Sequence, residues 1–285
     1  MTVERKDRES GGRFRPRKRL GQHFLVDPMV RDDMLAHTGF GVDDTILEVG
    51  PGQGALTLPL SQQVKTLIAV EKDRELIGPL EERLFEAGID NVTLIHQDIL
   101  KFDLKEIVSP PEKLHVIGNL PYNISTPFLE RLIQNRSYLG KAVLMFQLEV
   151  ARRLTAVSNS KAYGAMSVMV QYAAACQSIM PVKRTSFYPK PKVDSMVVAL
   201  DFERPYPKQA ADEGFFRRVV KAAFAHRRKI LLNSLKVLQP AMDRDRLMEG
   251  LRRCAIDPNR RAETLDMEDF LCLASALAID RPASA

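Results

Sequence analysis

Short apolar segments alternate with amphipathic ones over the first two hundred residues of the chain. Residues 28–38 are predicted to be helical because Asp27 can cap their first turn, and residues 73–87 predict a second helix that Gly78 and Pro79 should kink or break. The segments with the length and β-branched content of buried strands are 45–50, 66–71, 92–98, 114–120, 141–148 and 196–202. This alternation predicts an α/β fold with a doubly wound sheet, which binds ligands at the carboxyl ends of its strands.

The chain divides into three parts by pattern. Residues 1–19 lack apolar periodicity and are rich in charge, which predicts a disordered basic arm. The β-branched pattern ends near residue 204, and beyond it apolar residues recur at helical spacing, as at Phe216, Val219 and Val220. We therefore expect an α/β domain over 20–203 and a small all-helical domain over 204–285.

The net charge of +6 is unevenly distributed. Residues 1–19 contain eight Lys/Arg against three Asp/Glu, residues 204–285 contain sixteen against eleven, and the middle contains eighteen against twenty-two. The two ends are therefore +5 each and the middle is −4. Basic ends around an acidic centre predict contact with a polyanion, and a solvated basic surface is the alternative.

The three cysteines and five histidines are dispersed along the chain. Their spacings match neither a disulfide framework nor a zinc site, so we expect no metal. No apolar run approaches the roughly 20 residues of a membrane helix, and the N-terminus lacks the apolar stretch of a secretory signal. We expect a cytoplasmic protein without membrane contact.

A glycine-rich loop, Glu-Val-Gly-Pro-Gly-Gln-Gly over 48–54, follows the first predicted strand. Its third glycine comes too soon for a dinucleotide site, but the spacing suits the Glu-x-Gly-x-Gly-x-Gly loop of S-adenosylmethionine methyltransferases. Glu71 and Asp98 end the next two strands, where they could accept hydrogen bonds from the ribose and the adenine amino group of that cofactor. Alternatively, Glu71 pairs with Lys72 or Arg74, and Asp98 is a turn residue.

The fourth predicted strand ends in Asn-Leu-Pro-Tyr over 119–122. An adenine amino group is a poor nucleophile, so an enzyme must hold it in line with a methyl donor. The Asn119 side-chain oxygen and the Leu120 carbonyl can accept hydrogen bonds from its two hydrogens. Tyr122 can stack on the flipped base. The alternative is an ordinary turn after a strand.

Two later segments are candidates for RNA contact. The loop 186–195 mixes prolines, aromatics and lysines, so Phe187 could stack on the other face of the target base and the lysines could meet phosphates. The segment 215–229 contains six basic residues and, if helical, presents a basic face. A stiffened connection and a solvated helix are the respective alternatives.

In combination, these motifs resemble the small-subunit (16S) rRNA adenine N6-dimethyltransferase family, of the KsgA or dimethyladenosine transferase type. The resemblance covers about 18–270 and is also carried by Lys-Arg-Leu-Gly-Gln-His-Phe-Leu over 18–25 and Ala-His-Arg-Arg-Lys over 225–229. It implies a Rossmann-like fold, S-adenosyl-L-methionine without a metal, and dimethylation of two adjacent adenosines in the 3′-terminal hairpin of 16S rRNA. The partner would be the immature small ribosomal subunit, late in its biogenesis, and we expect a monomer.

The resemblance also assigns residues to the cofactor. They are His23, Leu25, Gly50, Gly52, Glu71, Asp98 and Asn119. Many relatives have Asn at position 23, so we expect His23 to act through its backbone or by packing. Other functions remain open: a macrolide-resistance methyltransferase acting on large-subunit rRNA, an organellar homologue, or chiefly an assembly factor. A DNA adenine methyltransferase would more often have Asp in place of Asn119.

Overall fold

The structure is a computed structural model that describes residues 17, 21–108, 111–238 and 242–279. Apart from Arg17, the predicted basic arm lies outside these residues, as does the start of the motif at 18–25.

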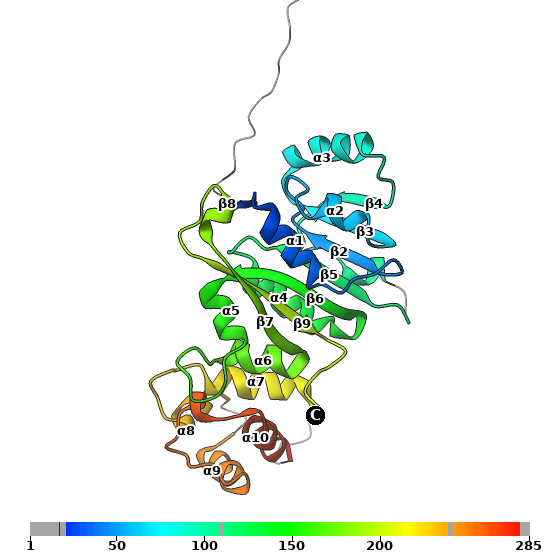
Figure 1. The fold of residues 1–285 in the computed structure, drawn as a ribbon. Helices are drawn as coiled ribbons and strands as arrows, with labels where there is room; N and C mark the ends of the chain where they lie inside the picture. Colours follow the sequence, from blue (N-terminus) through cyan, green and yellow to red (C-terminus); the bar gives the residue numbers. More distant parts are fainter. Residues whose placement is uncertain (1–16, 18–20, 109–110, 239–241, 280–285) are drawn as a thin grey trace, which may run out of the picture.

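A seven-stranded sheet forms the centre of the molecule, in the order β4-β3-β2-β5-β6-β9-β7 (Figure 1). Its strands are β2 (Thr45–Val49), β3 (Thr66–Glu71), β4 (Val92–His96), β5 (Leu114–Asn119), β6 (Leu139–Gln147), β7 (Ala175–Val182) and β9 (Ser195–Asp201). From β4 to β6 all neighbours are parallel, whereas β9 is antiparallel to both β6 and β7. The predicted α/β, doubly wound fold is confirmed.

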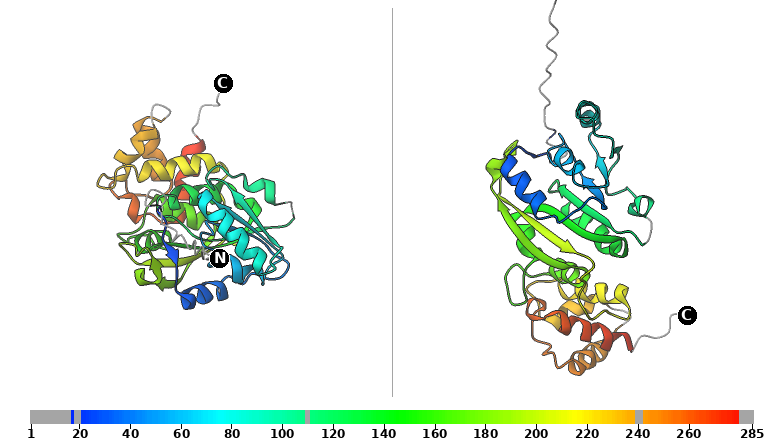
Figure 2. Two further views of the ribbon diagram at one scale, coloured as in Figure 1. Left: turned by 90° about the horizontal axis from the view of Figure 1, so that it is seen from above. Right: turned by 45° about the vertical axis from the view of Figure 1, so that its right-hand side comes forward.

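The helices lie on both sides of this sheet and at one end of it (Figures 1 and 2). They are α1 (Pro28–Ala36), α2 (Thr57–Ser61), α3 (Arg74–Glu86), α4 (Ser125–Gln134), α5 (Leu148–Leu154), α6 (Ala165–Ala173), α7 (Glu213–Ala223), α8 (Leu231–Leu235), α9 (Arg244–Arg253) and α10 (Met267–Ile279). A second, two-stranded sheet pairs β1 (Phe24–Leu25) with β8 (Phe187–Tyr188). β1 and β8 lie at the opposite end of the molecule from α8, α9 and α10.

Side-chain alternation divides the core between the two faces of the sheet. Along β6, Leu144 and Phe146 belong to the larger apolar cluster, and Val143 and Met145 belong to the smaller one. The strands are therefore buried on both faces, which explains why their sequences are continuously apolar.

The larger cluster continues past residue 204 into the C-terminal helices. At the junction, the rings of Tyr172 in α6 and Phe216 in α7 are 4.6 Å apart, and the Tyr172 hydroxyl donates a hydrogen bond to Glu213 at 3.3 Å. The region after 204 is helical, as the apolar spacing predicted, but it shares its core with the sheet. The domain boundary itself stays a prediction.

Three local expectations need correction. Helix α3 is not broken at Pro79, because Glu75, whose carbonyl loses its partner there, lies on the exposed side of the helix; a kink at Pro79 stays a prediction. Strand β7 was missed because its sequence mixes polar residues and a proline at a sheet edge. Cys254 and Cys272 form a disulfide, since α9 packs against α10 and brings together cysteines that spacing did not pair.

Candidate active site

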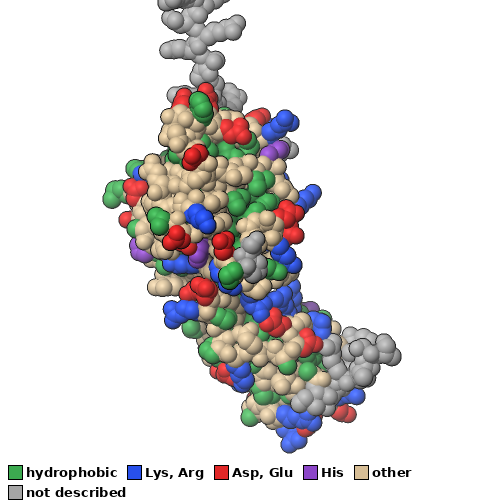
Figure 3. Space-filling view, turned by 90° about the vertical axis from the view of Figure 1, so that its right-hand side faces the viewer, with side chains coloured by type: hydrophobic (Ala, Val, Ile, Leu, Met, Phe, Trp, Pro, Cys, Tyr) green, Lys and Arg blue, Asp and Glu red, His purple; other side chains and the backbone are tan. Residues whose placement is uncertain are grey.

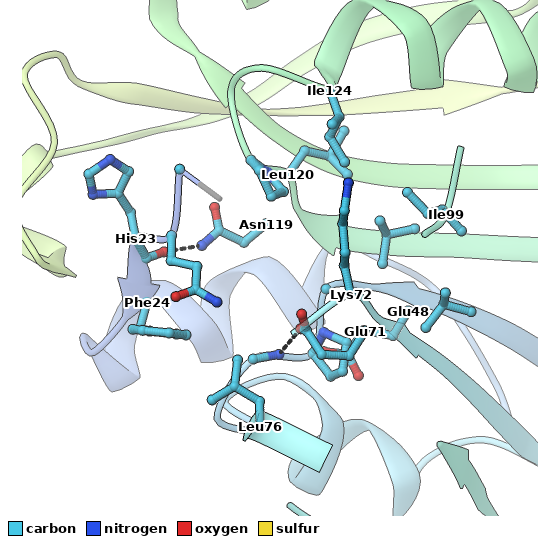
Figure 4. A pocket seen from close by; sticks show the side chains of 18 of the residues that line it. His23, Phe24, Glu48, Glu71, Lys72, Leu76, Ile99, Asn119, Leu120 and Ile124 are labelled. Atoms are coloured by element: carbon cyan, nitrogen blue, oxygen red, sulfur yellow. Dashed lines mark hydrogen bonds between the residues drawn. The ribbon is translucent and has the colours of Figure 1, made fainter. Parts of the chain in front are cut away.

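A cavity opens at the carboxyl ends of β2, β3, β4 and β5 (Figure 4). The strand order reverses between β2 and β5, which is where doubly wound sheets bind ligands. The lining comprises residues 21–25, 48–53, 55–56, 70–72, 76, 97–99 and 119–124. Every residue that the resemblance assigns to the cofactor lies in it, together with Leu120 and Tyr122.

The glycine loop keeps the floor of the cavity open. Gly50 and Gly52 have φ angles of 67° and 59°, in the region that glycine tolerates best. A Cβ at position 52 would lie 3.1 Å from the Phe24 ring, whereas one at position 50 would meet nothing within 4 Å. The backbone can therefore approach a ligand closely at this loop.

Glu71 is 7% exposed, and its carboxylate is held by backbone donors. The Gly52 N–H donates to one oxygen at 3.1 Å and the Asp73 N–H to the other at 2.8 Å. Burial raises the pKa of Glu71, and these N–H groups act against that rise. The alternative, an exposed Glu71 paired with Lys72 or Arg74, does not occur: Glu71 is buried, Lys72 pairs with a different acid, and Arg74 makes no ion pair with Glu71.

That acid is Asp98. The Lys72 ammonium donates to one carboxylate oxygen at 2.7 Å, and the Leu100 N–H donates to the other at 3.0 Å. Burial acts to raise the pKa of Asp98, but these hydrogen bonds outweigh it and hold the pKa below its usual value. Asp98 therefore lines the cavity and also shapes a turn.

Glu48 begins the glycine motif and is a further candidate for cofactor binding, although the resemblance did not assign it to the cofactor. Its side chain is 1% exposed, and none of the described residues gives its Oε2 a hydrogen bond. Burial raises its pKa to about 8. A buried acceptor without a donor, beside Glu71, suits a ligand that carries positive charge, as the sulfonium and amino groups of S-adenosylmethionine do.

The segment 21–25 is tied to the start of α3. Gln22 donates a side-chain hydrogen bond to Asp73 at 2.8 Å and accepts one from the Arg17 backbone N–H at 2.8 Å. Asp73, which also caps α3, is 1% exposed. These bonds fix the N-terminal wall of the cavity against its floor.

Asn119 has a defined orientation at the end of β5. Its Nδ2 donates a hydrogen bond to the His23 carbonyl at 2.8 Å (Figure 4). Because a carbonyl can only accept, the amide must present its nitrogen there, which leaves Oδ1 as the acceptor on the other side. The Tyr122 hydroxyl shares a hydrogen bond with Ser195 at 3.2 Å, and its ring lies 5.4 Å from the His23 ring.

Phe187 does not line this cavity. It pairs with Leu25 across the β1–β8 ribbon, and both side chains are buried in the smaller core cluster, Phe187 at 4% exposure. Stacking of Phe187 on a target base would require the side chain to leave the core. That role stays a prediction.

The basic segment 215–229 is only partly helical. Helix α7 ends at Ala223, and Arg227, Arg228 and Lys229 lie in the turns that follow. The Arg227 guanidinium donates to the Lys161 carbonyl. On the face shown in Figure 3, Lys and Arg side chains gather where the sheet region meets the C-terminal helices.

Two kinds of feature are absent from the described residues. They contain no group of three or more His, Cys, Asp or Glu side chains placed to hold a metal ion. Nor do they form a helix both long and apolar enough to cross a membrane.

Comparison with known proteins decides the family. The family model described as "Ribosomal RNA adenine dimethylase" matches residues 13–278. The chain belongs to this family. Among curated relatives, "Ribosomal RNA small subunit methyltransferase A" of Geobacter sulfurreducens is 45% identical, over 94% of this chain and 97% of the relative. The protein of the same name from Desulforapulum autotrophicum is 43% identical, over 92% of each chain.

Solved structures of dimethylases and their relatives share the fold. A dimethyladenosine transferase from Plasmodium falciparum is 26% identical, with a TM-score of 0.74 over 88% of this chain and 96% of that one. The 23S rRNA methyltransferase ErmE, 24% identical, has a TM-score of 0.68 over 90% of this chain and 99% of that one, which supports the fold alone. Membership of the dimethylase family confirms the predicted enzyme class, a methyltransferase that acts on rRNA adenine with S-adenosylmethionine as methyl donor.

Proposed function

We propose that this dimethylase transfers methyl groups to N6 of two adjacent adenosines in the 3′-terminal hairpin of 16S rRNA. The observation that carries the proposal is the orientation of Asn119, whose Oδ1 is left as an acceptor in a cavity lined by acidic side chains. The names of the curated relatives, small-subunit methyltransferases at 43–45% identity, favour the small subunit over the large one.

Three acids would hold the cofactor. Glu71 keeps lone pairs for the ribose hydroxyls, because a carboxylate has about four acceptor sites and backbone N–H groups use two. Asp98 would accept from the adenine amino group, and Glu48 would face the positively charged end. When bound, S-adenosylmethionine supplies an activated methyl group on its sulfonium.

The loop 119–122 would hold the target nitrogen. Asn119 Oδ1 and the Leu120 carbonyl would accept hydrogen bonds from the two amino hydrogens of the target adenine. These bonds would orient the nitrogen lone pair toward the methyl group. Tyr122, held by Ser195, offers a ring on which the flipped base can stack. Asn119 is neutral, so it acts by positioning, and no strong base is required.

We also infer that the protein acts as a monomer on the immature small subunit. The basic turn at 227–229 lies between α7 and α8, and α8 is at the opposite end of the molecule from β8, so the turn and the cavity together would span an extended RNA surface (Figure 1). An assembly-factor role would use the same surface, and it is separable from catalysis by the following experiment.

The test is Asn119→Ala, assayed with labelled S-adenosylmethionine and undermethylated small subunits, followed by mapping of the modified bases. We expect methyl transfer to fall by roughly 10²-fold or more, because a positioned acceptor is lost, while subunit binding is retained. Asn259→Ala, at an exposed position in the C-terminal region, is the matched control and should keep normal activity. Dimethyladenosine formed at a normal rate by the Asn119 variant, or wild-type product on large-subunit RNA, would overturn the proposal.

A further inference from the structure

We propose that Tyr188 is a stacking platform for the RNA base next to the target adenosine, an inference that rests on the proposed function. Its side chain is 63% exposed. Within the described part of the chain, the Tyr188 side chain has no hydrogen bond and no ring partner. A large aromatic face left open to solvent beside an active site calls for a partner with its own aromatic face.

The β1–β8 register puts Tyr188 on the same face of the ribbon as Phe24. Opposite residues of an antiparallel pair point to the same face, and the register pairs Phe24 with Tyr188 and Leu25 with Phe187. Leu25 and Phe187 face the core. Phe24 shares the face of Tyr188, and its ring lies beside Gly52 of the glycine loop, whereas Leu25 reaches the cavity lining from the core side.

Contacts connect Tyr188 to the catalytic loop. The next residue, Pro189, accepts a hydrogen bond from His23 Nδ1 at 2.6 Å, and the His23 ring lies 5.4 Å from the Tyr122 ring. The backbone that carries Tyr188 is therefore joined through Pro189 to His23, whose ring lies beside Tyr122. A base stacked on Tyr188 would sit beside one held at Tyr122.

The platform is anchored on both sides. Before it, the Ser186 hydroxyl donates to Asp27 at 2.9 Å. After it, the Asp194 carboxylate accepts a hydrogen bond from the Arg184 backbone N–H at 2.9 Å. Pro191, between Tyr188 and Asp194, is buried. A ring on a held backbone loses little freedom when a base stacks on it, so stacking there is favourable.

Positive charge adjoins the ring. Lys190 and Lys192 follow Tyr188 at alternate positions and are exposed. An aromatic face next to ammonium groups is the arrangement by which proteins bind single-stranded nucleic acid, with bases on the rings and phosphates at the charges. Flipping of one adenosine unstacks its neighbour, and Tyr188 would replace the lost stacking partner.

The kinetic test compares Tyr188→Ala with Tyr188→Phe on undermethylated small subunits. We expect the alanine variant to raise KM for the subunit about tenfold with little change in kcat or cofactor affinity, and the phenylalanine variant to behave like wild type. Phe85→Ala removes another exposed aromatic, on α3 and outside the cavity lining, and should change neither constant. An unchanged KM in Tyr188→Ala, with the wild type active, would overturn the inference.

A second measurement reports stacking directly. The chain contains no tryptophan, so Tyr188→Trp places a single, selectively excitable tryptophan on the platform. We expect its emission to be quenched by an RNA hairpin that carries the two adjacent adenosines, at hairpin concentrations that saturate binding, whereas Phe85→Trp should not respond. Saturated binding without quenching would overturn the inference. Failure of the proposed function is distinguishable, because the wild type would then not methylate the small subunit.

Discussion

The cofactor side of the cavity and the β1–β8 rim hold their functional groups in different ways. Glu71 is 7% exposed and its side chain takes two backbone hydrogen bonds, whereas Tyr188 is 63% exposed and only its backbone is held, by the pairing of β8 with β1 and by the anchored loop around it. A small ligand of constant shape, such as the cofactor, can be bound by buried acceptors whose positions are already fixed. An RNA surface can be bound by exposed rings and cations that stand on a held backbone.

The strongest test of the cofactor side is Glu71→Gln. A glutamine has one acceptor atom for two backbone donors, and its NH2 group would face one of them. Losing a hydrogen bond to a charged group costs about 1.5–3 kcal/mol, so we expect the Kd for S-adenosylmethionine, measured by calorimetry, to rise roughly 10- to 100-fold. Glu86→Gln, an exposed residue at the end of α3, is the control. Equal affinities would show that Glu71 is not preorganised for the cofactor.

The second test uses the pKa of Glu48, which burial raises from 4.5 to about 8. Between these values the folded protein keeps a proton that the unfolded chain releases, so the stability of the cofactor-free protein should fall as pH rises through this window. A cationic ligand favours the carboxylate, so cofactor binding should release a proton below pH 8, and affinity should rise with pH and level off above it.

Calorimetry in two buffers with different ionisation enthalpies would measure how many protons are released per cofactor bound. We expect release of up to about one proton per cofactor at neutral pH in the wild type, and none from this site in Glu48→Gln. If the variant releases as many protons as the wild type, another group titrates and Glu48 does not face the charge.

The smallest expected effect is at Lys72, the exposed partner of Asp98. Lys72→Ala should free the carboxylate and allow the pKa of Asp98 to rise, because its hydrogen bond with Lys72 is lost. Exposed ion pairs contribute about 0–1 kcal/mol, so cofactor affinity should tighten by a few-fold at most. Lys101→Ala removes a nearby charge without removing that hydrogen bond and serves as the control. Weaker binding in Lys72→Ala would mean that Lys72 contacts the cofactor itself.

Much of the fold and of the cofactor side could be predicted because the signals are local. Apolar runs of strand length located β2, β3 and β5 within a residue of their observed ends. The carboxyl ends of parallel neighbours share one edge of a sheet, so placing Glu71 and Asn119 at strand ends was enough to bring them to one cavity.

The rim could not be predicted in the same way. Neither Phe187 nor Tyr188 carries a sequence signal for which ring faces the core, since a strand of two residues is too short to show a pattern. The register with β1, a segment far away in the chain, decided that Phe187 is buried and Tyr188 is exposed.

The sequence by itself determined the α/β fold, the glycine loop and the identity of the acids at the strand ends, because these depend on residues close together in the chain. Tertiary structure alone decided the orientation of Asn119 toward His23, the pairing of Lys72 with Asp98 and the disulfide between Cys254 and Cys272. Each of these needs two segments to meet, and a pattern read along one segment carries no information about its partner.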